Sequence, residues 1–200
     1  MSDIIAVTNR ALSPDDFLSR IGRIAAARPA AIILREKDLD EAAYERIAKS
    51  ALDICRASGT RLIIHGFWRI AERLGSDALH MPLAALREMP AEKRAAFPVL
   101  GASCHSVDDA EEAVHLGCTY IIAGHIYDTD SKKGTPGRGL DFLKNVCGAV
   151  SVPVYAIGGI SPENIGDIRA AGAAGACVMS GAMRADNTGR YFAAFAEGEK

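Results

Sequence analysis

The chain has 200 residues, 49% of them hydrophobic and 24% charged, which is the composition of one globular domain large enough to bury a core. Its 23 basic and 25 acidic residues give a net charge of −2, so no global positive field attracts nucleic acid or a membrane surface. The longest opening apolar run, Ile4–Val7, is too short for the apolar region of a signal sequence, and no later run approaches the roughly 18 residues of a membrane span. We expect one cytoplasmic domain over residues 1–200.

Short apolar runs of strand type alternate with helical stretches along the chain. Strands are expected at Ile4–Thr8, Ala31–Arg35, Leu62–His65, Ala78–Met81, Val99–Ser103, Tyr120–His125, Val154–Gly158 and Ala176–Met179. Helices are expected at Pro14–Ala27 after Ser13, Asp40–Ala57, Val107–Leu116 after Ser106, Leu140–Cys147, and Pro162–Ala170 after Ser161. Gly59, Gly117 and Gly172 stand where helices should end.

Eight βα units in one domain favour a closed (β/α)8 TIM barrel over an open doubly wound sheet. A barrel of this kind places its chemistry at the carboxyl ends of the strands. The residues there are unusually polar, and they include Arg35, Glu36, Lys37, His65, Ser103, His105 and His125. The pattern therefore predicts a functional site at this end of the barrel.

The segment Gly124–Gly139, GHIYDTDSKKGTPGRG, combines a histidine at a strand exit with a loop rich in Gly, Lys and Arg. A histidine side chain can act as a general acid or base, and Lys132 lies on the loop that follows His125, so the segment pairs an acid/base group with an anion cradle. The alternative is a solvated basic loop after a buried strand. The first interpretation predicts an enzyme that acts on a small anionic molecule.

The ends of the last two strands carry glycines in the arrangement of a barrel phosphate site. The motifs are AIGGIS at 156–161 and VMSG at 178–181, and the predicted phosphate contacts are Gly158, Gly159, Ser180 and Gly181. The alternative is that the glycines merely permit a tight turn. Arg35 and Lys37 share a strand face and are predicted to bind an anion or carboxylate, whereas Glu36 points the other way and is predicted to be structural.

The sequence gives little support for a metal site or for disulfide bonds. Five scattered cysteines without a CxxC motif argue against a disulfide framework and against a cysteine-ligated zinc site. His65, His80, His105 and His125 end consecutive strands and could form a metal site, but no carboxylate at the expected ends of strands 3 and 4 completes it. One ordered histidine facing a bound anion is the simpler hypothesis, and we expect no metal.

Over nearly its full length the chain resembles the thiamine phosphate synthase superfamily. The motifs that carry this resemblance are LREK at 34–37, GASCHS at 101–106, the strand 6 loop, AIGGI and VMSG. The strand 6 loop looks most like that of the TenI-type thiazole tautomerases, in which histidine, here His125, replaces the proline of the synthases.

Three departures separate the chain from the synthases it resembles. Synthases end strand 3 with Asn-Asp and carry HLGQxD after strand 4, whereas this chain has His65-Gly66 and the residues HMPLAA at 80–85. Ile33 replaces a family glutamine. Both carboxylates that hold Mg²⁺ are missing, so synthase activity is not expected. The TenI-type branch would show Asn-Gly-Arg at strand 3, so the chain differs from that branch as well.

The resemblance implies an isomerase of thiamine biosynthesis that aromatises a carboxylated thiazoline phosphate without a cofactor. His125 would be the catalytic proton shuttle, with Arg35 or Lys37 on the carboxylate and Lys132 closing the loop. Ser103 joins Gly158, Gly159, Ser180 and Gly181 in the binding set. The partner is a small thiazole phosphate, and a homo-oligomer stays open. The alternatives are a Mg²⁺-dependent thiamine phosphate synthase and a non-catalytic phosphate-binding barrel.

Overall fold

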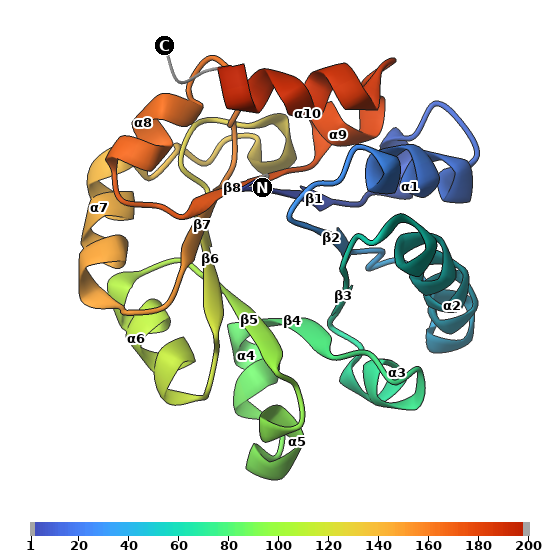
Figure 1. Ribbon diagram of the computed structural model, residues 1–200. Coiled ribbons are helices and arrows are strands. Elements are labelled where there is room, and N and C mark those ends of the chain that lie inside the picture. Colours follow the sequence, from blue (N-terminus) through green and yellow to red (C-terminus); the bar gives the residue numbers. More distant parts are fainter. Residues whose placement is uncertain (1–2, 198–200) are drawn as a thin grey trace.

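The computed structural model describes residues 3–197, which form a closed barrel of eight parallel strands in the order β1 to β8 (Figure 1). The strands are β1 (Ile4–Val7), β2 (Ala31–Leu34), β3 (Leu62–His65), β4 (Ala78–Pro82), β5 (Val99–Cys104), β6 (Tyr120–Gly124), β7 (Val154–Ile157) and β8 (Gly175–Val178). Pairing of β1 with β8, where Ile5 lies opposite Cys177, closes the barrel. The predicted (β/α)8 TIM barrel is confirmed.

The helices form a ring outside the strands in Figure 1. They are α1 (Phe17–Ala26), α2 (Glu41–Ser58), α3 (Trp68–Arg73), α4 (Leu83–Arg87), α5 (Ala91–Ala95), α6 (Val107–His115), α7 (Gly139–Ala149), α8 (Ile165–Ala170), α9 (Ser180–Arg184) and α10 (Thr188–Glu197), with the 3-10 turns η1 (Arg10–Leu12) and η2 (Asp130–Lys132). None within residues 3–197 has the length and apolar character needed to cross a membrane.

Two helices begin later than the sequence predicted. The first starts at Phe17, because Asp16 rather than Ser13 caps it by accepting a hydrogen bond from the Ser19 N–H. The second, α8, starts at Ile165, because the Asn164 side chain holds a turn in front of it. By contrast, Ser106 caps α6 as predicted.

Side chains of the strands alternate between two cores. Ile5, Ile33, Ile63 and Ile122 fill the barrel interior, whereas their chain neighbours pack against the helices outside. The residues two positions after Ile33 and Ile63 therefore fall on the same inward side at the carboxyl ends of the strands. We call this end of the barrel the barrel mouth.

Candidate functional site

A buried carboxylate joins the end of β2 to the end of β1. Glu36 accepts hydrogen bonds from the Thr8 hydroxyl at 2.6 Å and from the Arg10 backbone N–H at 3.0 Å. The Thr8 oxygen accepts a hydrogen bond from the Arg35 backbone N–H at 2.9 Å. Glu36 is structural, as predicted, and it fixes the backbone from which Arg35 and Lys37 project.

Three of the predicted binding residues form a cluster of positive charge at the barrel mouth. Burial, the charge of Arg35 and the charge of Lys132 lower the pKa of the Lys37 ammonium group, in that order. None of Arg35, Lys37 and Lys132 forms an ion pair with a carboxylate of residues 3–197. Cations that repel one another without a protein counter-charge are a favourable site for an anion.

His65 lies beside this cluster as a neutral imidazole. Burial, followed by the charges of Arg35 and Lys37, lowers its pKa to about 4. Its backbone N–H donates to the Tyr44 hydroxyl, which in turn donates to the Leu34 carbonyl oxygen at 2.6 Å, so the ends of β2 and β3 are held together. The His65 and His80 rings are stacked with centroids 5.7 Å apart.

Three hydrogen-bonding side chains from β4, β5 and β6 meet inside the barrel. His80 is buried, with Nδ1 at 3.0 Å from the Tyr120 hydroxyl and Nε2 at 2.9 Å from Ser103 Oγ. Ser103 is partly exposed, so it is the one of these three hydrogen-bonded side chains that is open to the barrel mouth. Burial holds the pKa of His80 well below its usual range.

The two remaining histidines of the strand ends bond to backbone carbonyls. His105 Nδ1 donates to the Gly124 carbonyl oxygen at 2.8 Å, whereas its neighbour Cys104 points into the outer core. His125 Nε2 donates to the Thr135 carbonyl oxygen at 3.1 Å. His125 is buried, and it fastens the loop that carries Lys132 to the end of β6.

The glycines of the predicted phosphate site lie at the expected strand ends, but close protein contacts also account for them. Gly158 and Gly159 have φ values of +104° and +66°, and a Cβ on Gly158 would meet His125 Cβ at 2.4 Å. A Cβ on Gly181 would meet the Tyr191 hydroxyl at 2.1 Å. Packing against His125 therefore requires glycine at 158, and a side chain at 181 would have to displace the Tyr191 ring, whatever binds there.

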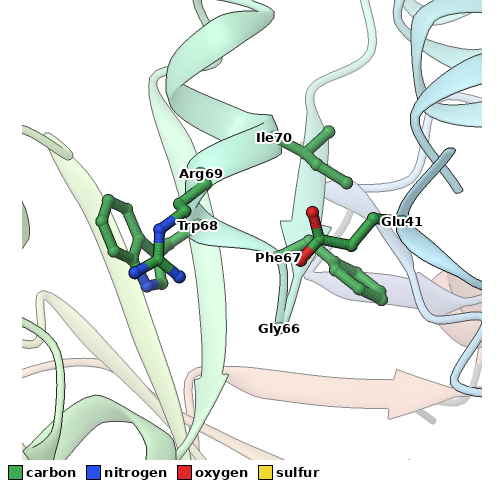
Figure 2. A pocket seen from close by; sticks show the side chains of 6 residues that line it. All are labelled: Glu41, Gly66, Phe67, Trp68, Arg69 and Ile70. Atoms are coloured by element: carbon green, nitrogen blue, oxygen red, sulfur yellow. The ribbon is translucent and has the colours of Figure 1, made fainter.

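A small cavity of about 80 Å³ lies where β3 runs into α3 (Figure 2). Gly66, Phe67, Trp68 and Glu41 are among its lining residues, and the Arg69 guanidinium lies 4.4 Å from the Trp68 ring centroid. The Phe67 ring packs on Tyr44 at 4.2 Å. Two aromatic residues, Phe67 and Trp68, thus directly follow the position at which the synthases described above carry Asn-Asp.

The fold is a (β/α)8 barrel with its polar strand-end motifs gathered at one end, and comparison with known proteins gives its family. The profile described as thiamine monophosphate synthase matches residues 4–182, so the chain belongs to that family, whose members are enzymes of thiamine biosynthesis. The predicted superfamily is confirmed.

Two curated relatives align with this chain over most of their own length. The thiamine-phosphate synthase of Methanoregula boonei is 34% identical over 89% of this chain and 84% of its own. That of Chlorobium luteolum is 33% identical over 92% of this chain and 86% of its own. A thiamine phosphate pyrophosphorylase structure from Pyrococcus furiosus has a TM-score of 0.82 at 24% identity, with 98% of this chain and 94% of that chain covered.

These relatives overturn the predicted tautomerase function. The two curated relatives match most of the chain under the name thiamine-phosphate synthase, and neither is named a tautomerase. The isomerase assignment was wrong because it rested on one loop, in which His125 replaces proline. In the structure this histidine donates a hydrogen bond from Nε2 to the Thr135 carbonyl oxygen. This structural contact explains the histidine without a role in proton transfer.

The Mg²⁺ of the synthases does not fit the residues at this barrel mouth. The end of β3 carries His65 and Gly66, and β4 ends at Pro82 and leads directly into α4. The nearby Glu36 is buried and already bonded to Thr8 and Arg10. Within residues 3–197, no three His, Cys, Asp or Glu side chains are arranged to hold a metal, and that includes the four strand-end histidines.

Sequence reasoning missed two members of this site. Tyr120 was assigned only to a strand, and His80 was considered only as a metal ligand. The available signal was Gly101, which lies opposite both His80 on β4 and Tyr120 on β6 in the strand register. A glycine with a large polar side chain opposite it on each of the two flanking strands indicates that one of these side chains crosses over it.

Proposed function

We propose that this protein is a thiamine-phosphate synthase, a transferase that couples a pyrimidine pyrophosphate to a thiazole phosphate. The observation that carries the proposal is the 34% identity to the synthase of Methanoregula boonei over 89% of the chain. The cationic cluster at the barrel mouth supports it, because a coupling of this kind releases pyrophosphate and needs positive charge where that anion forms.

Arg35, Lys37 and Lys132 would bind the pyrophosphate group. Arg35 offers a planar fork of donors to phosphate oxygens, and the two lysines add point charges. The relief of repulsion among these three cations would favour binding further. Because the carboxylates for Mg²⁺ are replaced, we assign the neutralisation of the leaving group to these side chains and derive no step through a metal.

The thiazole phosphate would lie at the ends of β7 and β8. Gly158, Gly159, Ser180 and Gly181 offer backbone N–H groups there, and Ser180 adds an exposed hydroxyl. Ser103 would bind between this subsite and the cationic cluster. His125 would act indirectly, since its bond to Thr135 holds the Lys132 loop near the mouth.

Pyrophosphate release from the two substrates tests this assignment. We expect Lys37→Gln and Lys132→Gln each to lower kcat/KM at least about tenfold, which corresponds to the loss of one charge-assisted contact. Lys49→Gln, an exposed lysine of α2, is the control and should retain the wild-type rate. Equal rates in all three variants would place the pyrophosphate elsewhere.

A second candidate is a barrel that binds phosphate ligands without turnover. The specific observation in its favour is the replacement of both Mg²⁺-holding carboxylates, which leaves His65 and Gly66 at the end of β3. Binding of a thiazole phosphate by titration calorimetry, together with no pyrophosphate release, would support this candidate over the transferase.

A further inference from the structure

The buried contact between His80 and Tyr120 depends on a glycine. His80 lies on β4 and Tyr120 on β6, with Gly101 of β5 opposite both. A Cβ on Gly101 would lie 2.1 to 2.6 Å from three carbons of the Tyr120 ring. The tyrosine therefore crosses over β5 in the space that Gly101 leaves and reaches His80.

Tyr120, His80 and Ser103 form a row of hydrogen-bonded side chains. The number of hydrogens that their polar atoms carry fixes the direction of each hydrogen bond in this row. Burial keeps His80 uncharged, so one ring nitrogen carries a hydrogen and the other accepts one. Burial also raises the pKa of Tyr120, so its hydroxyl keeps its hydrogen. Within residues 3–197, that hydroxyl has His80 Nδ1 as its hydrogen-bond partner.

The Tyr120 hydrogen must therefore point to Nδ1, since a buried O–H without an acceptor costs about 1–3 kcal/mol. With Nδ1 as acceptor, the His80 hydrogen is on Nε2 and is donated to Ser103 Oγ. The hydrogen of Ser103 cannot point back at His80. Because Ser103 is partly exposed and has no other hydrogen bond within the described residues, its hydrogen is free to point into the barrel mouth.

We propose that Tyr120 and His80 are positioning residues that set Ser103 as a hydrogen-bond donor toward the substrate. Ser103 is the group that touches the ligand, and the acceptor is an anionic oxygen of the pyrophosphate or thiazole phosphate. The opposite tautomer would turn the Ser103 hydrogen toward His80 and present an oxygen lone pair to an anion, which is repulsive. The inference rests on the proposed function for the identity of the ligand, whereas the tautomer of His80 does not depend on it.

Nitrogen-15 NMR of the imidazole tests the tautomer directly. We expect His80 to carry its hydrogen on Nε2 and to have a bare Nδ1 at neutral pH. Loss of the signals in His80→Phe identifies them, and a change at Nδ1 in Tyr120→Phe gives the same assignment if the first variant does not fold. A hydrogen on Nδ1 overturns the proposal, whatever the protein catalyses.

Binding of inorganic pyrophosphate by titration calorimetry tests the role of the hydroxyl. Ser103→Ala should weaken binding about tenfold or more, and Ser103→Thr, which keeps the donor, should stay near the wild-type affinity. His80→Phe should weaken binding when Ser103 is present and have no further effect in Ser103→Ala. Equal weakening by His80→Phe in both backgrounds shows a packing role and overturns the positioning role. A wild-type protein that does not bind pyrophosphate overturns the ligand role, and the NMR result still decides the tautomer.

Discussion

The Glu36 carboxylate and the Thr8 hydroxyl are 28 residues apart in the chain and form a buried hydrogen bond of 2.6 Å between the ends of β2 and β1. The same carboxylate accepts the Arg10 N–H, and Thr8 accepts the N–H of Arg35. The backbone that carries Arg35 and Lys37 is thereby fixed before any ligand arrives. A rigid support of this kind lowers the entropic cost of ordering a binding site.

Removal of the Glu36 carboxylate should destabilise the fold. We expect Glu36→Ala to lower the free energy of unfolding by about 3 kcal/mol, because it leaves the buried Thr8 hydroxyl and the Arg10 N–H without their acceptor. Urea denaturation measures this. Glu111→Ala on the exposed side of α6 is the matched control and should change stability by less than about 0.5 kcal/mol. Equal stability of the two variants would contradict the structural role of Glu36.

Gly101 should be intolerant of even one methyl group. Gly101→Ala forces the Tyr120 ring away from β5, and such overpacking costs about 1–3 kcal/mol. Gly148→Ala in α7 is the control, since no atom lies within 4 Å of its added Cβ and alanine favours a helix, so stability should rise slightly. Thermal unfolding of both variants gives the comparison. A Gly101→Ala protein as stable as the wild type would show that Tyr120 need not cross β5.

Acid should destabilise the protein through His65. Its folded pKa is about 4, below the value of about 6.5 for an unperturbed histidine, so the unfolded chain binds the proton more readily than the folded one. Stability due to the neutral imidazole is present above about pH 6.5 and is lost as the pH falls toward about 4. His65→Gln should therefore show a flatter pH dependence in urea denaturation, by up to about 3 kcal/mol across this range. An identical pH profile for the variant would mean that folding does not lower the pKa of His65.

Much of the fold could be predicted from the sequence, because strongly apolar runs of strand type recur with helical stretches between them. All eight strands were located within about one residue. The short helices α3, α4 and α5, of five or six residues, were missed because they contain too few turns for a helical period. The ten-residue helix α10 was missed as well. The starts of α1 and α8 were misplaced because several capping side chains compete before each helix.

The site could be predicted less completely, because its contacts join residues that are distant in the chain. The link from Tyr120 to His80 spans 40 residues and depends on the register of three strands. The bond from His125 to the Thr135 carbonyl depends on how the loop folds back, which spacing does not reveal. Gly181 was attributed to phosphate approach, and its close contact with the Tyr191 side chain could not be foreseen from the sequence.

Binding of pyrophosphate should not require a divalent metal. The side chains that hold Mg²⁺ in the synthases are replaced at the ends of β3 and β4, and Arg35, Lys37 and Lys132 supply positive charge instead. We expect titration calorimetry with inorganic pyrophosphate to give affinities within about threefold of each other in EDTA and in excess Mg²⁺, a difference of less than about 1 kcal/mol. Binding that appears only with Mg²⁺ would mean that the metal has other ligands in this protein.

The most direct test of the central claim is the product itself. The purified protein is mixed with the pyrimidine pyrophosphate and the thiazole phosphate, and the mixture is analysed by mass spectrometry. A synthase forms thiamine phosphate and an equal amount of pyrophosphate, at a rate that depends on Lys37. If both substrates bind but neither product appears, with or without Mg²⁺, the transferase assignment is contradicted.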